Sequence, residues 1–295
     1  MFIGFHAKAQ GESHKENNIP CQDSSSYLLS KNNKFGIAVV ADGHGGEKYF
    51  RSEKGSKFAV EISIQVLRLF VEQLKGEKNV MPHLKQIASN IIFQWRKNIL
   101  EDIHNNPLNE DEHKLCSEKN IKISNDDDLV SIYGTTLIIA FVTEICIFAI
   151  QIGDGTCIVI SKDGEAKIAI PEDDRLAFGK TTSLCNPDAI DNFRYIFIRE
   201  KVLGVTVATD GVSDSFIPEK YLEFNINLME DFVKSEDAQE KLKNFLPELS
   251  KRGSRDDVAI AGIFNKIECK KYIYRKKKES EVRINIENKK QLLRS

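Results

Sequence analysis

The chain has 295 residues, of which 41% are hydrophobic and 29% are charged, and its formal net charge is −2. A chain of this length buries a large core, and its near-neutral charge excludes a protein that coats nucleic acid or anionic membrane over its whole surface. Its six cysteines show no C-x-x-C spacing, so we expect free thiols and a cytoplasmic location. We expect no export signal, because the N-terminus lacks a basic segment followed by an apolar core, and no membrane span, because polar residues interrupt the most apolar stretch, 137–152.

Near the N-terminus, strands are expected on both sides of a polar loop at 11–22. The strand at 35–40 is strongly apolar and leads into residues 42–46, which read Asp-Gly-His-Gly-Gly. A buried strand fixes the position of Asp42, and the glycines leave the backbone open to an ion or a phosphate. Alone this pattern is weak, because Asp-Gly after a strand is usually a turn.

Two amphipathic helices are predicted after this strand. The first covers 58–70 and stops near Gly76, and the second begins near Pro82 and ends at Pro107. The stretch from about 105 to 128 is acidic and lacks periodicity, which indicates an exposed insertion.

Strand patterns dominate the second half of the chain. An irregular flap is expected at 171–193, with 181–185 as a candidate docking edge, and a helical region is expected at 221–249. Helices that are grouped apart from strands favour an α+β fold, in which helix pairs cover antiparallel sheets. Beyond Lys266 the chain is strongly basic. The predicted strands are 135–142, 145–152, 157–161, 167–170, 194–199, 202–209 and 258–264.

Carboxylates recur where the predicted strands end or begin. In antiparallel sheets these positions would meet at one edge. Two carboxylates about 4 Å apart repel by about 4 kcal/mol, so a cation must balance them. Oxygen ligands without a cysteine and histidine cage suit Mg²⁺ or Mn²⁺, and two such ions suit the hydrolysis of a phosphate ester. The residues concerned are Asp42, Asp154, Asp210, Asp214, Asp256 and Asp257.

Five short motifs occur in the order of a known family. On these motifs the chain resembles the metal-dependent protein phosphatases of type 2C, from about residue 4 to residue 264. The resemblance implies a four-layer α-β-β-α sandwich, with two antiparallel sheets flanked by helix pairs, that acts on phosphoserine and phosphothreonine in proteins. Its domain would cover residues 1–265, followed by a basic tail of residues 266–295. The motifs are Asp42-Gly43-His44-Gly45-Gly46, Gly134-Thr135-Thr136, Gly153-Asp154-Gly155, Ala208-Thr209-Asp210-Gly211-Val212-Ser213-Asp214 and Ser254-Arg255-Asp256-Asp257.

The resemblance also implies roles for single residues. Catalysis would proceed through a metal-activated water without a phosphoenzyme, and His44 would be the general acid for the leaving oxygen. Two Mn²⁺ or Mg²⁺ ions would be bound, with a third at a weaker site. The implied ligands are Asp42 as the bridge, the Gly43 carbonyl, Asp210 and Asp256, with Asp154 and Asp214 for the third ion.

The loop before the second strand departs from the family pattern. Gln22 stands where a glutamate is common, and no arginine precedes Asp23 to bind the substrate phosphate. Asp23 would still anchor a metal-bound water. His14 or Lys15 would supply the missing positive charge.

Two other functions remain as alternatives. The altered loop before Asp23 suits a catalytically inactive relative that keeps the fold to bind a partner. The basic tail, with Tyr272 and Tyr274, suits a contact with an acidic partner or a two-metal nuclease, although a solvated, partly disordered extension also explains it. The core lacks a groove-wide positive charge, which disfavours nucleic acid. The leading interpretation is a protein serine/threonine phosphatase whose partners are phosphoprotein substrates.

Overall fold

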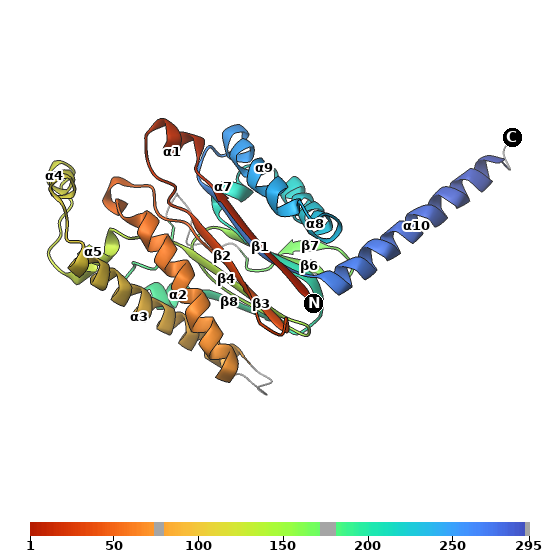
Figure 1. The fold of residues 1–295 in the computed structure, drawn as a ribbon, viewed down its shortest axis with the longest axis horizontal. Helices are drawn as coiled ribbons and strands as arrows, with labels where there is room; N and C mark the ends of the chain where they lie inside the picture. The colour runs from red at the N-terminus through yellow and green to blue at the C-terminus, as the bar shows by residue number, and fades with distance from the viewer. Residues whose placement is uncertain (74–79, 172–180, 293–295) are drawn as a thin grey trace.

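The computed structural model describes residues 1–73, 80–171 and 181–292 of the chain (Figure 1). In these ranges the strands are β1 Phe2–Ala9, β2 Ser24–Leu29, β3 Phe35–Ala41, β4 Leu137–Thr143, β5 Ile147–Ile152, β6 Thr156–Ser161, β7 Ala166–Ile168, β8 Arg194–Ile198, β9 Val202–Ala208 and β10 Val258–Asn265. The helices are α1 Glu12–Glu16, the 3₁₀ helix η1 Glu47–Tyr49, α2 Ser52–Gln73, α3 Met81–Asn105, α4 Glu110–Glu118, α5 Asp126–Ser131, α6 Ala189–Asn192, α7 Asp210–Ser213, α8 Pro218–Lys234, α9 Ala238–Arg252 and α10 Lys266–Leu292.

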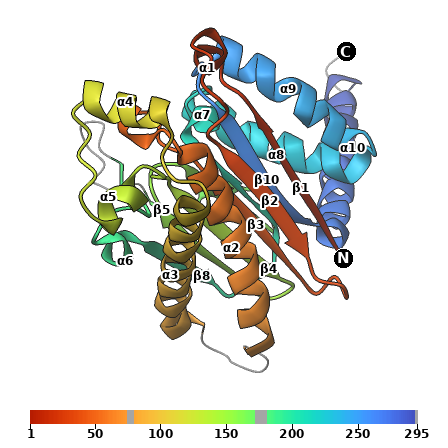
Figure 2. The same cartoon turned by 60° about the vertical axis from the view of Figure 1, so that its left-hand side comes forward.

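Two five-stranded antiparallel sheets form the centre of the molecule, with the strand orders β1-β10-β9-β6-β7 and β2-β3-β4-β5-β8. Helices α2 and α3 cover the outer face of the second sheet, and α8 and α9 cover the outer face of the first (Figures 1 and 2). The predicted α+β fold class, with two antiparallel sheets flanked by helices, is confirmed.

The side chains of β3 explain this layering. Ile37 and Val39 face α2 and α3, whereas Ala38 and Val40 face the other sheet, and all four are fully buried. Successive side chains point to opposite faces of a strand, so a strand that is apolar at every position is buried on both faces. Trp95 of α3 completes the outer layer, where burial of its ring contributes about 3 kcal/mol to folding.

Some predicted elements differ in detail from the observed ones. The helical region expected at 221–249 is interrupted at Ser235 and forms α8 and α9. The polar loop at 11–22 contains the short helix α1. The stop expected at Gly76 and residues 172–180 of the expected flap lie outside the described residues.

The insertion expected at 105–128 is more ordered than its composition indicated. It contains α4, and Asn109 and Glu112 form a capping box at the start of that helix. Such reciprocal bonds satisfy two backbone N–H groups that a helix end otherwise leaves without partners. The insertion therefore carries local helical signals that its lack of apolar periodicity hid.

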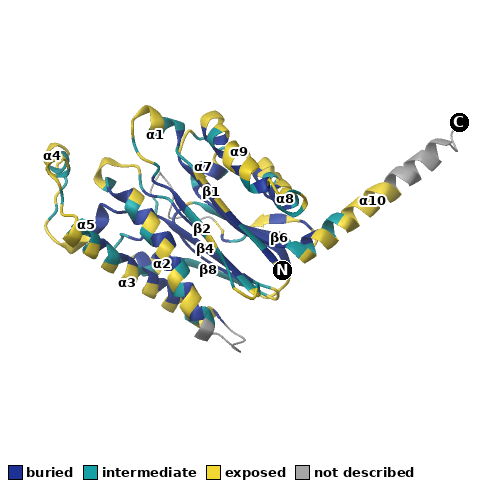
Figure 3. Cartoon of the chain, viewed as in Figure 1, coloured by how far each residue is buried: buried dark blue, intermediate teal, exposed yellow. Residues whose placement is uncertain are grey.

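The basic tail forms the helix α10, which projects from the body of the molecule (Figure 1) and is largely exposed (Figure 3). Its first turns pack on the body. Cys269 is fully buried, its thiol donates to the Leu203 carbonyl at 3.2 Å, and Tyr272 lies against Gly164. The described part of the tail is thus helical, and beyond its first turns it is exposed to solvent. Across the described ranges, every helix is too short or too polar to cross a membrane.

Candidate metal centre

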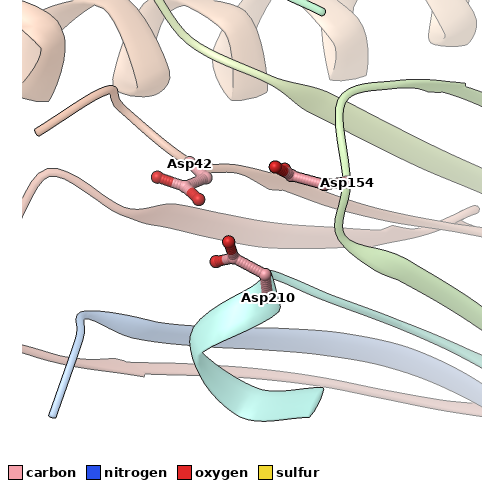
Figure 4. Close-up of side chains that lie close together, drawn as sticks. All are labelled: Asp42, Asp154 and Asp210. Atoms are coloured by element: carbon pink, nitrogen blue, oxygen red, sulfur yellow. The ribbon is translucent and has the colours of Figure 1, made fainter. Parts of the chain in front are cut away.

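One end of the sandwich collects strand ends from both sheets. Asp42 follows β3 of one sheet, Asp210 begins α7 just after β9 of the other, and Asp154 lies in the turn from β5 to β6. The three carboxylates face one another (Figure 4), and each has an oxygen within 4.8 Å of an oxygen of the others. The antiparallel pairing thus brings together residues that are far apart in the sequence.

The Gly134-Thr135-Thr136 motif holds the backbone of Asp42. Thr135 Oγ1 donates to the Asp42 carbonyl at 2.8 Å, and the Asp42 N–H donates to Thr136 Oγ1 at 3.0 Å. Gly153 packs against Thr136 with a φ of 101°, and a side chain there would lie 2.5 Å from the threonine. These contacts fix the main chain from which the Asp42 carboxylate projects.

Burial and mutual repulsion raise the pKa of three carboxyl groups. Burial, followed by the charges of Asp23 and Asp210, raises the pKa of Asp42 well above its usual range. Burial and the charge of Asp154 raise the pKa of Asp210 to about 6. Burial also raises the pKa of Asp23, although Thr209 donates a hydrogen bond to it at 2.7 Å. Without a cation, the cluster therefore resists full ionisation.

The cluster opens into a cavity of about 500 Å³. Among the described residues that line it are Asp42, Asp154, Asp210 and Asp256, and none of those lining residues is a lysine or an arginine. A set of carboxylate oxygens without a protein cation fits a hard divalent ion such as Mg²⁺ or Mn²⁺.

The other predicted ligands lie around this cluster. The side chain of Asp256 is half exposed and lines the cavity. Asp214 lies just after α7, and burial and the charges of Asp154 and Asp256 raise its pKa. Gly43 lies against the chain before β2, where a side chain would approach the Gln22 carbonyl oxygen to 2.7 Å. These positions keep each predicted ligand within the same end of the sandwich.

His44 lines the cavity next to Asp42. Its backbone N–H donates to the Gly134 carbonyl at 3.1 Å, and its ring makes a T-shaped contact with the Tyr49 ring at a centroid distance of 4.8 Å. Burial lowers the pKa of His44 to about 4, although the charge of Asp154 opposes this shift. Without an anionic ligand the imidazole is therefore neutral at pH 7.

The two basic residues that were predicted to contact a phosphate lie in different places. His14 Nδ1 is 2.9 Å from Asp257 Oδ2, and its Nε2 is 3.9 Å from Asp256 Oδ1. Lys15 pairs with Glu12 at 3.5 Å and lines a separate surface pocket. His14 thus lies beside the acidic cluster, whereas Lys15 does not line its cavity.

Asp257 organises the N-terminal loop, a role that the sequence analysis did not assign. It is 3% exposed and accepts hydrogen bonds from the Gly11 N–H at 2.6 Å and the Gln22 N–H at 2.5 Å, in addition to its contact with His14. The signal in the sequence was the doubled carboxylate at 256–257. Only one of the two lines the cavity, so the other is available to hold the loop.

Several solved structures with the same fold are phosphatases. A bacterial serine phosphatase shares 16% identity with this chain at a TM-score of 0.55, and the alignment covers 90% of this chain and 98% of that one. Stp1 from Staphylococcus aureus, a serine/threonine phosphatase, shares 16% identity at a TM-score of 0.54, with 90% and 95% covered. The catalytic domain of the serine/threonine phosphatase PstP, solved with two manganese ions, shares 15% at 0.54, with 89% and 97% covered. At these low identities, the TM-scores show a shared fold.

Among curated protein sequences, none matches this chain. A family model described as "Protein phosphatase 2C" matches residues 10–247, which is most of the chain. The match includes Asp42, Asp154 and Asp210, the three carboxylates that meet in the cavity. The chain therefore belongs to the protein phosphatase 2C family.

Proposed function

We propose that the protein is a metal-dependent phosphatase that hydrolyses phosphoserine and phosphothreonine in proteins. The observation that carries this proposal is the meeting of Asp42, Asp154 and Asp210 in a cavity whose described lining has no lysine or arginine. The two manganese ions of PstP, a serine/threonine phosphatase of the same fold, support it.

Two Mn²⁺ or Mg²⁺ ions would bind at this end of the sandwich, and a third would bind more weakly. Such ions lower the pKa of a water molecule and screen the charge of a phosphate. The proposed ligands are Asp42 between the two ions, the Gly43 carbonyl, Asp210 and Asp256, with Asp154 and Asp214 for the third ion and Asp23 as the anchor of a water molecule.

His44 would donate the proton to the leaving serine or threonine oxygen. Its ring lines the cavity and packs against the Tyr49 ring. The negative charge of a bound phosphate would raise the pKa of His44, in the same direction as the charge of Asp154. The ring would then take up its proton when the substrate is present, which is when the proton is needed.

His14 would contribute to phosphate binding in place of the missing arginine. Asp257 Oδ2 lies 2.9 Å from Nδ1 of the ring, and Nε2 lies on the side of Asp256. The side chain is 13% exposed, so its position is set by the protein and not by solvent. Lys15 is not retained as a phosphate contact, because it pairs with Glu12 and lines a different pocket.

Phosphopeptide hydrolysis tests this proposal. Wild type is expected to hydrolyse a phosphoserine peptide with Mn²⁺ and to lose activity in EDTA, and Asp42→Asn is expected to be inactive. Asp163→Asn removes a carboxylate of the β6–β7 turn, which is exposed, and serves as the matched control. Metal-independent turnover, or full activity of Asp42→Asn, would show that the proposal is wrong.

A catalytically inactive relative that keeps the fold to bind a partner remains the second candidate. Gln22, which stands where a glutamate is common in the family, has a structural role instead. Its side-chain amide donates to Ser52 Oγ at 2.7 Å, so this residue joins the chain before β2 to the first residue of α2. Calorimetry with Mn²⁺ separates the two functions. Tight metal binding without turnover of any phosphopeptide would favour the partner-binding module.

A further inference from the structure

An acidic segment of a substrate that lies beside the candidate catalytic cavity would need positive charge on the rim of that cavity. Its described lining contains no lysine or arginine, and several cations nearby are already paired with carboxylates. The paired cations are Lys15 with Glu12, Arg255 with Glu16, and Arg96 with Asp127.

Lys48 of η1 is the exception. It is exposed, and in the described part of the chain no carboxylate lies within ion-pair distance of its amine. Its Nζ lies 5.8 Å from the centre of the Tyr49 ring. Tyr49 lines the cavity and contacts His44, so Lys48 lies one side chain away from the proposed general acid.

The segment that carries Lys48 is held from outside by the α4 insertion. Lys119 Nζ pairs with Glu47 at 2.5 Å, and Arg51 Nε pairs with Glu112 at 2.6 Å. In Figure 2, α4 lies close to the chain that leads into α2. Glu47 and Arg51, the charged residues on either side of Lys48, are thus paired with residues of the insertion. The amine of Lys48 itself forms no ion pair with a described residue.

The charge of Lys48 also reaches the wall of the cavity. Cys185 lines the cavity, and although burial raises the pKa of its thiol, the charge of Lys48 opposes that rise. A positive charge that stabilises a thiolate at this wall would likewise stabilise an anionic group of a bound peptide. The same wall includes Asn186, a neutral hydrogen-bonding side chain.

Resting on the proposed function, we propose that Lys48 binds a carboxylate of the phosphoprotein substrate close to the phosphorylated residue. The protein would then prefer acidic sequences around its phosphoserine or phosphothreonine. Because the pair is exposed to water, the preference is modest, about threefold, and it weakens as salt screens the charges.

The test measures kcat/KM of wild type and of Lys48→Gln for three substrates, with Mn²⁺ present. Two phosphoserine peptides differ only in having glutamate or glutamine beside the phosphoserine, and p-nitrophenyl phosphate carries the phosphate alone. Lys48→Gln is expected to lower kcat/KM about threefold for the glutamate peptide and to leave the other two substrates unchanged. In about 0.5 M salt the difference between the peptides should shrink toward zero.

The control is Lys57→Gln, which removes the same charge from the exposed face of α2 and should leave the preference intact. Equal losses on all three substrates would mean that Lys48 contacts the phosphate itself, which overturns the inference. No change on any substrate overturns it as well.

A binding measurement separates this inference from the proposed function. Phosphonate analogues of the two peptides are not hydrolysed, and their affinities for wild type and Lys48→Gln are measured with Mn²⁺ present. If wild type hydrolyses no phosphopeptide, the proposed function fails, yet a loss of the glutamate preference in Lys48→Gln still supports the role of Lys48. Equal affinities of the two analogues for wild type overturn that role.

Discussion

The metal-centre end of the sandwich collects carboxylates and the helix α10 collects mainly lysines and arginines, but the fold treats the two sets of charges differently. Asp42, Asp154 and Asp210 are forced together by rigid strand ends, with oxygens within 4.8 Å of one another. The cations of α10 lie along an exposed helix, and its described part includes Lys270, Lys271, Arg275, Lys276, Lys277 and Lys278.

This contrast shows when a run of like charges indicates a ligand. In α10, water screens the cations and several pair with carboxylates, as Lys271 does with Glu268 and Lys276 with Glu230. In the cluster, burial and repulsion raise the pKa of Asp42 and Asp210. Only the cluster has an unfavourable free energy that a bound cation would relieve.

The largest expected effect comes from Asp210→Asn. We expect kcat/KM to fall about a thousandfold, which is about 4 kcal/mol of transition-state stabilisation. At a Mn²⁺ concentration about a hundred times the dissociation constant, wild type should gain about 2.7 kcal/mol in unfolding free energy, and the variant should lose that gain. Without metal, the variant should be more stable than wild type, because one repelling charge is gone.

Thermal unfolding with Mn²⁺ and with EDTA measures both effects. Asp231→Asn on α8 is the matched control, since its side chain is exposed and does not line the cavity. A metal-induced rise in Tm that persists in Asp210→Asn would contradict the assignment of this carboxylate as a ligand.

Arg51 sharpens the comparison, because it is a buried charge whose partners belong to the protein. Its side chain is 7% exposed, and its guanidinium donates to Glu112, to the Tyr133 hydroxyl at 2.8 Å and to the Asn106 carbonyl at 2.9 Å. Arg51→Ala should lower the free energy of unfolding by about 3 kcal/mol, because it leaves these groups without a partner. Denaturant unfolding measures this loss. The control is Arg68→Ala at an exposed position, which should change the free energy of unfolding by less than about 0.5 kcal/mol.

Gly134→Ala tests whether the orientation of His44 matters. A side chain at this position would lie 2.7 Å from His44 Cδ2 and 2.7 Å from Tyr49 Cδ1, so the imidazole must shift. We expect about a tenfold loss of kcat, because a displaced catalytic group reacts less often in the correct geometry. The Mn²⁺-induced rise in Tm should persist, and its loss would show that the substitution disturbs the metal site instead.

Acid should release the insertion helix. The hydrogen bonds from Arg51 lower the pKa of Glu112 below its usual value near 4.5. A carboxyl with a lowered pKa stabilises the fold above its unfolded pKa, and this stability is lost as pH falls through the folded value. Glu112→Gln should therefore cost about 1 kcal/mol at pH 7, and this cost should shrink as pH falls below 4.5. A cost that does not change with pH would contradict this explanation.

The smallest effect is expected in α10. The double variant Lys270→Gln and Lys277→Gln should change the free energy of unfolding by less than about 0.5 kcal/mol and should leave the Mn²⁺-induced rise in Tm unchanged. Both side chains are exposed, so water already solvates their charges. A larger loss, measured by denaturant unfolding, would mean that the helix packs on the body beyond its first turns.

The convergence of the carboxylates was predictable because it follows from local pattern and strand direction. A strand such as β3, apolar at every position, must be buried on both faces, and antiparallel order then places Asp42, Asp154 and Asp210 at one end. The long helices α2 and α3 were likewise visible from their apolar periodicity, because each needs one face against a sheet.

What the sequence did not reveal depends on contacts between distant segments. The link between Asp257 and the Gly11 N–H joins residues 246 positions apart. The order of α10 depends on where Leu203 and Gly164 lie, and no local pattern of the tail contains that information. The bracing of η1 by α4 also required knowledge of the tertiary fold.

Asp42 and Asp210 follow strands of different sheets, which gives a metal ion shared by them a mechanical consequence. Such an ion would cross-link the two layers at one end of the sandwich, as a disulfide joins two segments of chain. Between these sheets, side chains such as Val40 and Val207 make apolar contacts, which are not directional. The supply of divalent cations would then set how tightly the two sheets are held together, as well as how fast the protein works.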